Sequence, residues 1–114
     1  MPLCRKILSF DQENVPKIMI SPKINGKVFE FILDTGAFAT MANKEVWEAI
    51  GKPYLHPSNR AVGGIGGHVL PLGRCRVSVE IHGKTSREWL YIIENGMMLF
   101  GRNWIDSLTI KIEH

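Results

Sequence analysis

The chain has 114 residues, 45% of them hydrophobic and 22% charged, which is typical of one soluble globular domain with its own core. No apolar run reaches the ~18 residues that a membrane span needs, so we expect no membrane partner. The net charge of +3 comes from basic residues scattered singly or in pairs, without an aromatic-interleaved basic run, so we expect ordinary solvated surface rather than a nucleic-acid partner.

The cysteines and histidines indicate neither a disulfide framework nor a metal site. Cys4 and Cys75 lie far apart, which favours two reduced thiols. The four histidines form no i,i+4 pair, so we expect no metal and no cofactor. The first residues contain no long apolar stretch ahead of a small-residue cleavage site, so an intracellular, cytoplasmic location is expected.

The first third of the chain predicts an arm followed by a hairpin. Residues 1–14 are weakly patterned and are interpreted as a loosely held N-terminal arm. Strands are predicted over 17–20 and 27–33, on either side of Asn25-Gly26, because Asn-Gly between apolar runs is a strong hairpin signal. The second strand is apolar throughout at 31–33, as a central buried strand would be, and it leads directly into Asp34.

The rest of the chain predicts one short helix and a series of strands. A helix is predicted over 43–50, with Asn43 as its cap and Gly51 as its end. Residues 60–72 carry a glycine cluster; strands are predicted over 76–81, 88–93 and 108–112, with turns at 82–84 and 95–96. The prediction is a single mostly β domain over 1–114, closed or nearly closed like a barrel, with one or two short helices.

The triplet Asp34-Thr35-Gly36 carries the strongest chemical signal. A carboxylate that follows a buried strand and precedes a glycine turn can activate water, but only with a second carboxyl that shares its proton. The triplet occurs once, so it predicts a two-fold dimer in which Asp34 from each subunit meets at the axis. The competing interpretation is a turn-forming aspartate, with Thr35 bonded inside the turn and Gly36 present for its backbone freedom.

The glycines at 63–67 do not form a phosphate-binding motif. The sequence lacks G-x-x-x-x-G-K-[ST], and G-x-G-x-x-G fails because position 69 is valine. A β-hairpin tip that opens and closes fits better, with Ile65 at its apolar end and backbone N–H groups available to a ligand. A plain flexible loop is the alternative.

Three blocks together resemble the retropepsins, the homodimeric aspartic proteases of retroviruses and LTR retroelements. They are Ile32-Leu33-Asp34-Thr35-Gly36-Ala37, Gly63-Gly64-Ile65-Gly66-Gly67 and Leu99-Phe100-Gly101-Arg102-Asn103, in the order and at the spacing of that family. The resemblance spans about residues 17–112. It implies the acid-protease fold, with residues 60–72 as a glycine-rich flap hairpin.

The resemblance also implies a role for each matching residue. Asp34 would be catalytic, Thr35 would form hydrogen bonds across the dimer axis, and Gly36 would contact the substrate backbone. The flap residues Gly63, Gly64 and Ile65 would bind substrate, and Arg102 and Asn103 would support the loop that carries Asp34. The side-chain pockets would be lined by Ala37, Met41, Ile65, Met97 and Leu99. The N-terminal arm and a C-terminal strand over 108–114 would build the dimer interface.

One position departs from the family pattern. Many viral members carry an acidic residue directly after D-T-G-A, where it pairs with the arginine of the late Gly-Arg block, but this chain has Phe38 and Ala39. Arg102 would then need another partner, either a backbone carbonyl or an acid of the second chain. The cleft near Asp34 would also be less polar, which predicts apolar or aromatic substrate side chains there.

The predicted function is therefore an aspartic endopeptidase that processes a retroviral or retroelement polyprotein, in the cytoplasm or in a virion or virus-like particle. Water would be activated between the two Asp34 carboxyls, with no covalent intermediate and no metal. Two alternatives stay open: a cellular retropepsin-like domain, and a peptide-binding dimerisation module without hydrolytic activity.

Overall fold

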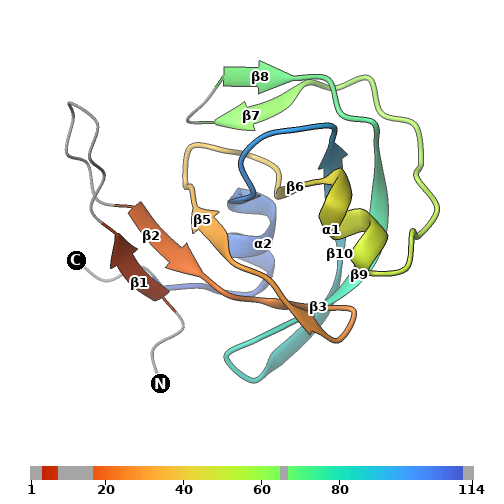
Figure 1. The fold of residues 1–114 in the computed structure, drawn as a ribbon. Coiled ribbons are helices and arrows are strands. Elements are labelled where there is room, and N and C mark those ends of the chain that lie inside the picture. The colour runs from red at the N-terminus through yellow and green to blue at the C-terminus, as the bar shows by residue number, and fades with distance from the viewer. Residues whose placement is uncertain (1–3, 8–16, 65–66, 112–114) are drawn as a thin grey trace.

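The computed structural model describes residues 4–7, 17–64 and 67–111, and for 4–7 it describes the backbone. The described elements are β1 (Cys4–Ile7), β2 (Lys17–Ile20), β3 (Lys23–Ile24), β4 (Lys27–Val28), β5 (Phe31–Leu33), β6 (Met41–Asn43), α1 (Lys44–Ala49), β7 (Val62–Gly64), β8 (Gly67–Val69), β9 (Gly73–Ile81), β10 (Lys84–Ile93), β11 (Leu99–Phe100) and α2 (Arg102–Ser107). Figure 1 shows a curved sheet around two short helices, with the hairpin β7–β8 lying across one end.

The main sheet has nine strands in the order β1-β2-β5-β11-β6-β10-β9-β3-β4. The pairs β5–β11 and β6–β10 are parallel, and the other neighbours are antiparallel. The order has two ends, β1 and β4, so the predicted closed barrel is corrected to an open, curved sheet. The mostly β prediction with two short helices is confirmed.

The N-terminal half shows two differences from the predicted strands. The strand predicted over 27–33 is two strands, because β4 pairs with β3 whereas β5 pairs with β2 and β11. Between them, the Phe29 N–H still donates to the carbonyl of Pro22, its neighbour in the β3–β4 register, at 3.1 Å. The predicted turn is present at Asn25-Gly26, where both φ angles are positive, 49° and 88°, but it joins β3 to β4. Within the predicted arm, 4–7 pairs with β2; the remaining arm residues lie outside the described ranges.

The helix α1 follows the sequence prediction at both ends. Asn43 accepts a hydrogen bond from the Val46 N–H at 3.1 Å, which satisfies one N–H of the first turn. At the other end, Gly51 has a φ of 101°, and Lys52 donates to the carbonyl of Trp47 at 3.0 Å. This is the hydrogen-bond pattern of a Schellman cap, in which a glycine with positive φ ends the helix.

The strand predicted over 108–112 is wrong over its described part. The N–H of Ile110 donates to the carbonyl of Ile105 at 2.9 Å and that of Thr109 to Asp106 at 3.3 Å, with a φ of 54° at Thr109. These bonds close the C-terminus of α2, so the backbone there ends a helix instead of joining a sheet. Residues 112–114 lie outside the described ranges, and an interface role for 108–114 stays a prediction.

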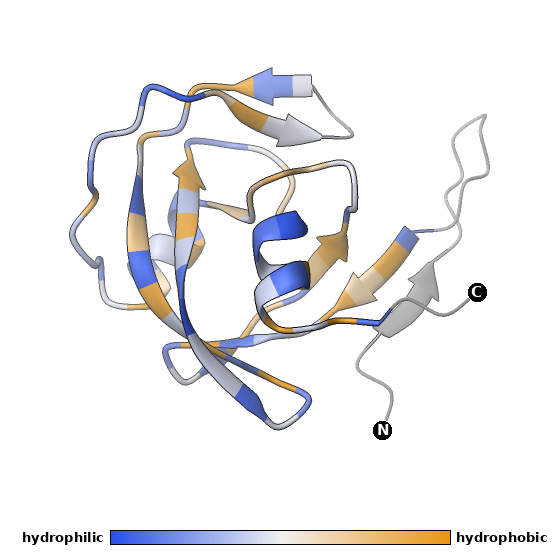
Figure 2. Ribbon diagram, turned by 180° about the vertical axis from the view of Figure 1, so that it is seen from behind, coloured by the Kyte–Doolittle hydropathy of each residue, from blue (hydrophilic) through white to orange (hydrophobic). Residues whose placement is uncertain are grey.

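The core has two parts that lie on opposite faces of the sheet. The larger part packs the strands against the helices, and the ring of Trp104 meets those of Phe31 and Phe100 at 6.2 and 5.4 Å between centroids. The alternation along β9 places Val77 and Val79 in this core, and Figure 2 shows the same alternation of orange and blue. The smaller part lies beneath β7, and its fully buried members include Ala37, Val62 and Leu99.

Burial also determines the acidity of Cys75, the one cysteine whose side chain the structure describes. Cys75 faces the larger core with no exposed surface, and desolvation raises the pKa of its thiol to about 11. Its thiolate is therefore scarce near neutral pH, which indicates a packing role rather than a reactive one.

The capped start of α1 yields a stability prediction. We expect Asn43→Ala to lower the free energy of unfolding by about 1 kcal/mol, because the Val46 N–H loses its acceptor. Urea denaturation at fixed protein concentration measures the change. Glu48→Ala, exposed on the same helix, is the control and should change stability by less than about 0.5 kcal/mol. Equal losses of stability in the two variants would contradict the assignment of a stabilising helix cap to Asn43.

Candidate active site

Asp34 lies directly after β5, at the start of the loop 34–40, which we call the active-site loop. Its backbone N–H donates to the carbonyl of Phe100 at 3.0 Å, and the N–H of Ile32 donates to Met98 at 2.9 Å. These bonds fix β5 beside β11, so the position of Asp34 is set by a buried strand pair. The Asp34 side chain is half-buried, whereas Thr35 and Gly36 are exposed.

The two carboxylate oxygens of Asp34 face different groups. Oδ1 accepts a hydrogen bond from the Gly36 N–H at 2.9 Å, and the Asp34 carbonyl accepts from the Ala37 N–H at 3.2 Å. This is the local turn that the alternative interpretation of the triplet predicted. Oδ2 faces Gly64 of β7, so Asp34 forms the turn and also presents an oxygen to the hairpin above it.

The active-site loop is bound to the N-terminus of α2. The N–H groups of Arg102 and Asn103, which have no partner inside the helix, donate to the carbonyls of Ala37 and Phe38 at 2.7 and 3.0 Å. Gly101 permits this approach, because a Cβ there would lie 2.5 Å from the Ala39 oxygen. The helix therefore uses its open backbone donors to hold the loop.

A side-chain network strengthens the same junction. Oδ1 of Asn103 accepts hydrogen bonds from both the N–H and the hydroxyl of Thr40, at 2.9 and 2.8 Å. The Thr40 hydroxyl oxygen in turn accepts from the Gly101 N–H at 2.9 Å. Thr40 is fully buried, so every polar group that this network pairs would otherwise carry a desolvation cost. Sequence reasoning named Asn103 but missed Thr40, whose signal was a polar residue at the start of the apolar stretch Met41–Ala42.

Arg102 does not behave as the sequence predicted. Its guanidinium pairs with Asp106 at 3.5 Å, one turn along α2, and both side chains are more than half exposed. Within the single chain the partner is therefore an acid of the same helix; an acid of a second chain stays a prediction. The i,i+4 spacing of the two residues was the signal that could have found it. Support of the loop comes from the Arg102 backbone.

The hairpin β7–β8 forms the described part of the flap, residues 60–72, and lies above the active-site loop (Figure 1). Gly63 and Gly64 lie on β7; Ile65 and Gly66 lie outside the described residues. The Cα of Gly64 faces the loop so closely that a Cβ there would overlap Oδ2 of Asp34 and come within 3.2 Å of the Ala37 Cβ. Only glycine fits this contact without a shift of the flap.

The residues predicted to line side-chain pockets lie together under the flap. Ala37, Met41 and Leu99 are buried in the smaller core, and the half-buried Met97 packs against it. A mainly apolar pocket of about 160 Å³ opens beside them. Its lining is Met41, Gly67, Val69, Ile93, Asn95, Gly96 and Met97. Val69 and Ile93 were missed, although Val69 is an apolar residue of the predicted flap and Ile93 ends a predicted strand.

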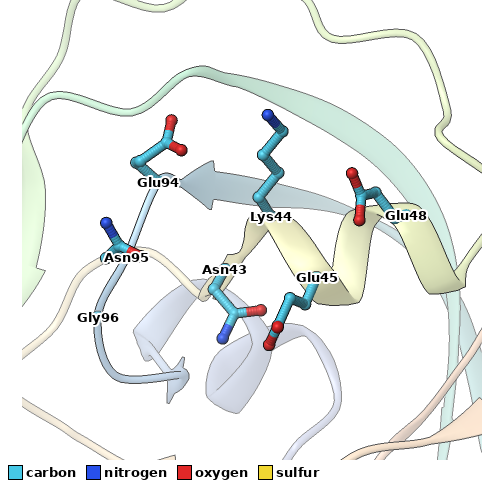
Figure 3. A pocket seen from close by; sticks show the side chains of 7 residues that line it. All are labelled: Asn43, Lys44, Glu45, Glu48, Glu94, Asn95 and Gly96. Atoms are coloured by element: carbon cyan, nitrogen blue, oxygen red, sulfur yellow. The ribbon is translucent and has the colours of Figure 1, made fainter.

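A larger, polar pocket of about 300 Å³ lies apart from Asp34, between the start of α1 and the turn after β10 (Figure 3). Glu94 and Asn95 come from the turn, and Lys44, Glu45 and Glu48 come from the helix. It shares Asn95 and Gly96 with the apolar pocket, but we assign it no role in the chemistry, because its lining contains no residue of the active-site loop or of the flap. Within the described ranges, no group of three or more His, Cys, Asp or Glu could hold a metal ion. Among those same residues, no helix is long and apolar enough to cross a membrane.

Comparisons with known proteins agree with this geometry. A family model described as aspartyl protease matches residues 20–104. The uncharacterized protein K02A2.6 of Caenorhabditis elegans is 28% identical over 100 residues, a match that covers 87% of this chain and 8% of that protein. Among solved structures, EIAV protease complexed with the inhibitor HBY-793 is similar with a TM-score of 0.70 at 18% identity, covering 94% of this chain and 100% of that one.

The loop junction yields a prediction that separates two neighbouring residues. We expect Asn103→Ala to lower the free energy of unfolding by about 2–3 kcal/mol, because the buried Thr40 N–H and hydroxyl lose their shared acceptor. Arg102→Ala should cost less than about 1 kcal/mol, because it removes an exposed ion pair and keeps the backbone bond to Ala37. Urea denaturation at one protein concentration measures both. Comparable losses would contradict the assignment of the side-chain support to Asn103.

Proposed function

This chain belongs to the aspartyl protease family, and on that premise we propose that it is an aspartic endopeptidase that works as a homodimer. In the proposal, water is activated between the Asp34 carboxyls of two subunits. The observation that carries it is the position of Asp34, on a loop held by α2 and directly beneath a glycine of the flap. The overall fold, similar to that of EIAV protease, is consistent with this chemistry.

The need for a second subunit follows from the number of carboxylates. Acid proteases of this chemistry use two aspartates that share one proton, and this chain has a single Asp-Thr-Gly triplet. Thr35 and Gly36, next to Asp34, are exposed in the single chain, so the tip of the loop is accessible to a second copy. A two-fold axis at this tip would place the same surface of both subunits in contact, as an isologous dimer requires.

The proposed mechanism uses the two carboxyls in different protonation states. Because two carboxyls in contact cannot both ionise readily, one proton is shared, and the pair titrates as a unit. The ionised carboxylate takes a proton from the water while the water oxygen attacks the amide carbon of the substrate. The protonated carboxyl donates its proton to the carbonyl oxygen of the substrate. Collapse of the tetrahedral intermediate breaks the C–N bond, and the leaving nitrogen receives a proton.

The substrate in this proposal is an extended peptide between the active-site loop and the flap. The apolar pocket at Met41, Val69 and Met97 is suited to an apolar side chain. Gly64 contacts Asp34 in the described conformation, so the flap has to move outward before a peptide can bind. We further propose that the substrate is a polyprotein of a retrovirus or retroelement, processed in the cytoplasm or in a particle. The match to K02A2.6 covers only 8% of that protein, which is consistent with a protease domain inside a much longer polyprotein.

The first test is hydrolysis of a panel of decapeptides at mildly acidic pH. We expect Asp34→Asn to abolish turnover, because the pair loses the carboxylate that accepts the proton of water. Wild-type turnover should fall faster than linearly on dilution, should be blocked by pepstatin and should be highest on the acid side of neutral.

The matched control is Asp106→Asn, which changes an exposed aspartate on α2 and should retain turnover. A wild-type chain that dimerises and binds peptides but cleaves none, with the same affinity in Asp34→Asn, would replace the proposal with a peptide-binding module. A rate that rises steadily to high pH would contradict the shared-proton mechanism.

The flap contact yields a second prediction. We expect Gly64→Ala to lower kcat/KM at least tenfold, because its Cβ would overlap Oδ2 of Asp34 and keep the closed flap from reaching the loop. Cleavage of one peptide by the purified variant measures this. His68→Ala, on the exposed strand β8 of the same hairpin, should stay within about twofold of wild type. An unaffected Gly64→Ala enzyme would show that catalysis does not use this flap position.

A further inference from the structure

The ring of Phe38, the residue that stands where the family pattern has an acid, is covered by the positively charged side chain of Arg60. The guanidinium carbon of Arg60 lies 3.8 Å from the centroid of the Phe38 ring. Phe38 belongs to the active-site loop and packs against the small core beneath the flap, and Arg60 lies exposed just before β7. A cation over an aromatic ring is an attractive arrangement, so the pair forms a defined surface feature at the rim of the site.

The contact continues outward as a chain of stacked arginines and aromatic rings. The Phe38 ring meets that of Tyr91 edge-on at 6.2 Å, and Arg74 donates a hydrogen bond to the Tyr91 hydroxyl at 3.4 Å. The guanidinium of Arg74 also lies 4.1 Å from the Trp89 centroid, and that of Arg76 lies 5.0 Å from it. We call this row the Arg–aromatic ladder: Arg60, Phe38, Tyr91, Arg74, Trp89 and Arg76.

The ladder carries three positive charges, and no carboxylate of residues 17–64 or 67–111 forms an ion pair with them. Among the residues that the structure describes, the ion pair at 4.0 Å or less is Arg102–Asp106, on α2. Arg60, Arg74 and Arg76 are therefore held by aromatic rings and keep guanidinium N–H donors for an incoming group. A guanidinium matches the planar geometry of a carboxylate, so the chemistry that complements this row is acidic.

The ladder is within reach of a peptide bound at Asp34. The chain turns between Asp34 and Phe38, because the Ala37 N–H donates to the Asp34 carbonyl at 3.2 Å, so the two residues lie closer than the about 14 Å that four extended residues would span. A substrate that places its scissile bond over Asp34 and extends along the loop would therefore bring a residue within about four positions of that bond to Arg60. In a two-fold dimer the same reach exists on both sides of the scissile bond.

We propose that the Arg–aromatic ladder binds acidic side chains of the substrate, within about four residues of the scissile bond, and so sets part of the cleavage specificity. The inference rests on the proposed protease function. It differs from the sequence-based expectation of apolar or aromatic partners at Phe38, which stays a prediction, because the fold places the Arg60 guanidinium on that ring.

A nucleic acid is the other ligand that arginines and aromatics suggest, and the geometry favours it less. Binding of single strands uses open aromatic faces on which bases stack. The Trp89 ring already contacts two guanidiniums and the edge of His56, and the Phe38 ring is covered by Arg60. The ladder also begins at the active-site loop, which is where a peptide substrate would lie.

The test compares peptide pairs that differ by one charge. A cleavable decapeptide is made with Glu or with Gln at each of the four positions on either side of the scissile bond in turn, and kcat/KM is measured at about pH 5.5, where Glu is ionised. We expect the Glu peptide to be preferred about fivefold to tenfold at low salt, mainly through KM, with a smaller preference at 1 M salt. In Arg60→Gln the Glu-to-Gln ratio should fall to about one, and in Arg60→Lys it should recover in part.

Lys23→Gln, which removes one charge from the distant strand β3, is the control and should keep the wild-type preference. Equal kcat/KM for the Glu and Gln peptides, or a preference that survives Arg60→Gln, would overturn the inference while leaving the proposed protease function unaffected.

Failure to cleave any peptide would instead count against the proposed function. In that case the affinities of labelled Glu and Gln peptides for the Asp34→Asn protein are compared by fluorescence anisotropy. Tighter binding of the Glu peptide that is lost when Arg60→Gln is added supports the proposal, and equal binding of the two peptides overturns it. Arg60-dependent binding of single-stranded RNA without peptide discrimination would reassign the surface to nucleic acid.

Discussion

The junction between the active-site loop and the first turn of α2 is the constraint on which the rest of the site depends. A helix start exposes backbone N–H groups, and here Arg102 and Asn103 donate theirs to the carbonyls of Ala37 and Phe38. The Asn103 side chain adds two bonds to the buried Thr40. α2 holds the second half of the loop, and β5, paired with β11, holds its start. The position of Asp34 is therefore set by the surrounding backbone. A catalytic carboxylate needs such support, since small displacements cost much of its rate effect.

The flap and the loop together define what the site can accept. Gly64 approaches Asp34 closely enough that any side chain there would collide with the carboxylate. The same closeness means that substrate binding and flap opening are coupled in the proposed function. The apolar pocket at Met41 and Met97 and the cationic rim at Phe38 and Arg60 then offer two different environments along one extended peptide. Specificity would arise from both, with the rim selecting charge and the pocket selecting shape.

The charge pattern shows how tertiary structure changes an interpretation of composition. Along the sequence, Arg60, Arg74 and Arg76 are isolated basic residues, and their spacing predicts a plain solvated surface. The pairing of β9 with β10 sets Arg74 opposite Tyr91 and Arg76 opposite Trp89, and the active-site loop brings Phe38 to the same row. Cross-strand neighbours cannot be identified from spacing alone, because they depend on register.

Local signals in the sequence were enough for the elements and for the family. The Asn25-Gly26 turn, the Asn43 cap and the Gly51 end each depend on a few adjacent residues, and the three motif blocks predicted a retropepsin fold that the comparisons confirm. Two features required the folded chain: the open sheet in place of a closed barrel, and the helix cap where a strand over 108–112 was predicted. The sequence by itself determined the local turns, the helix caps and the family, because these are properties of neighbouring residues. Only the tertiary structure decided their partners, because Thr40 and Asn103, or Phe38 and Arg60, meet through packing between segments far apart in the chain.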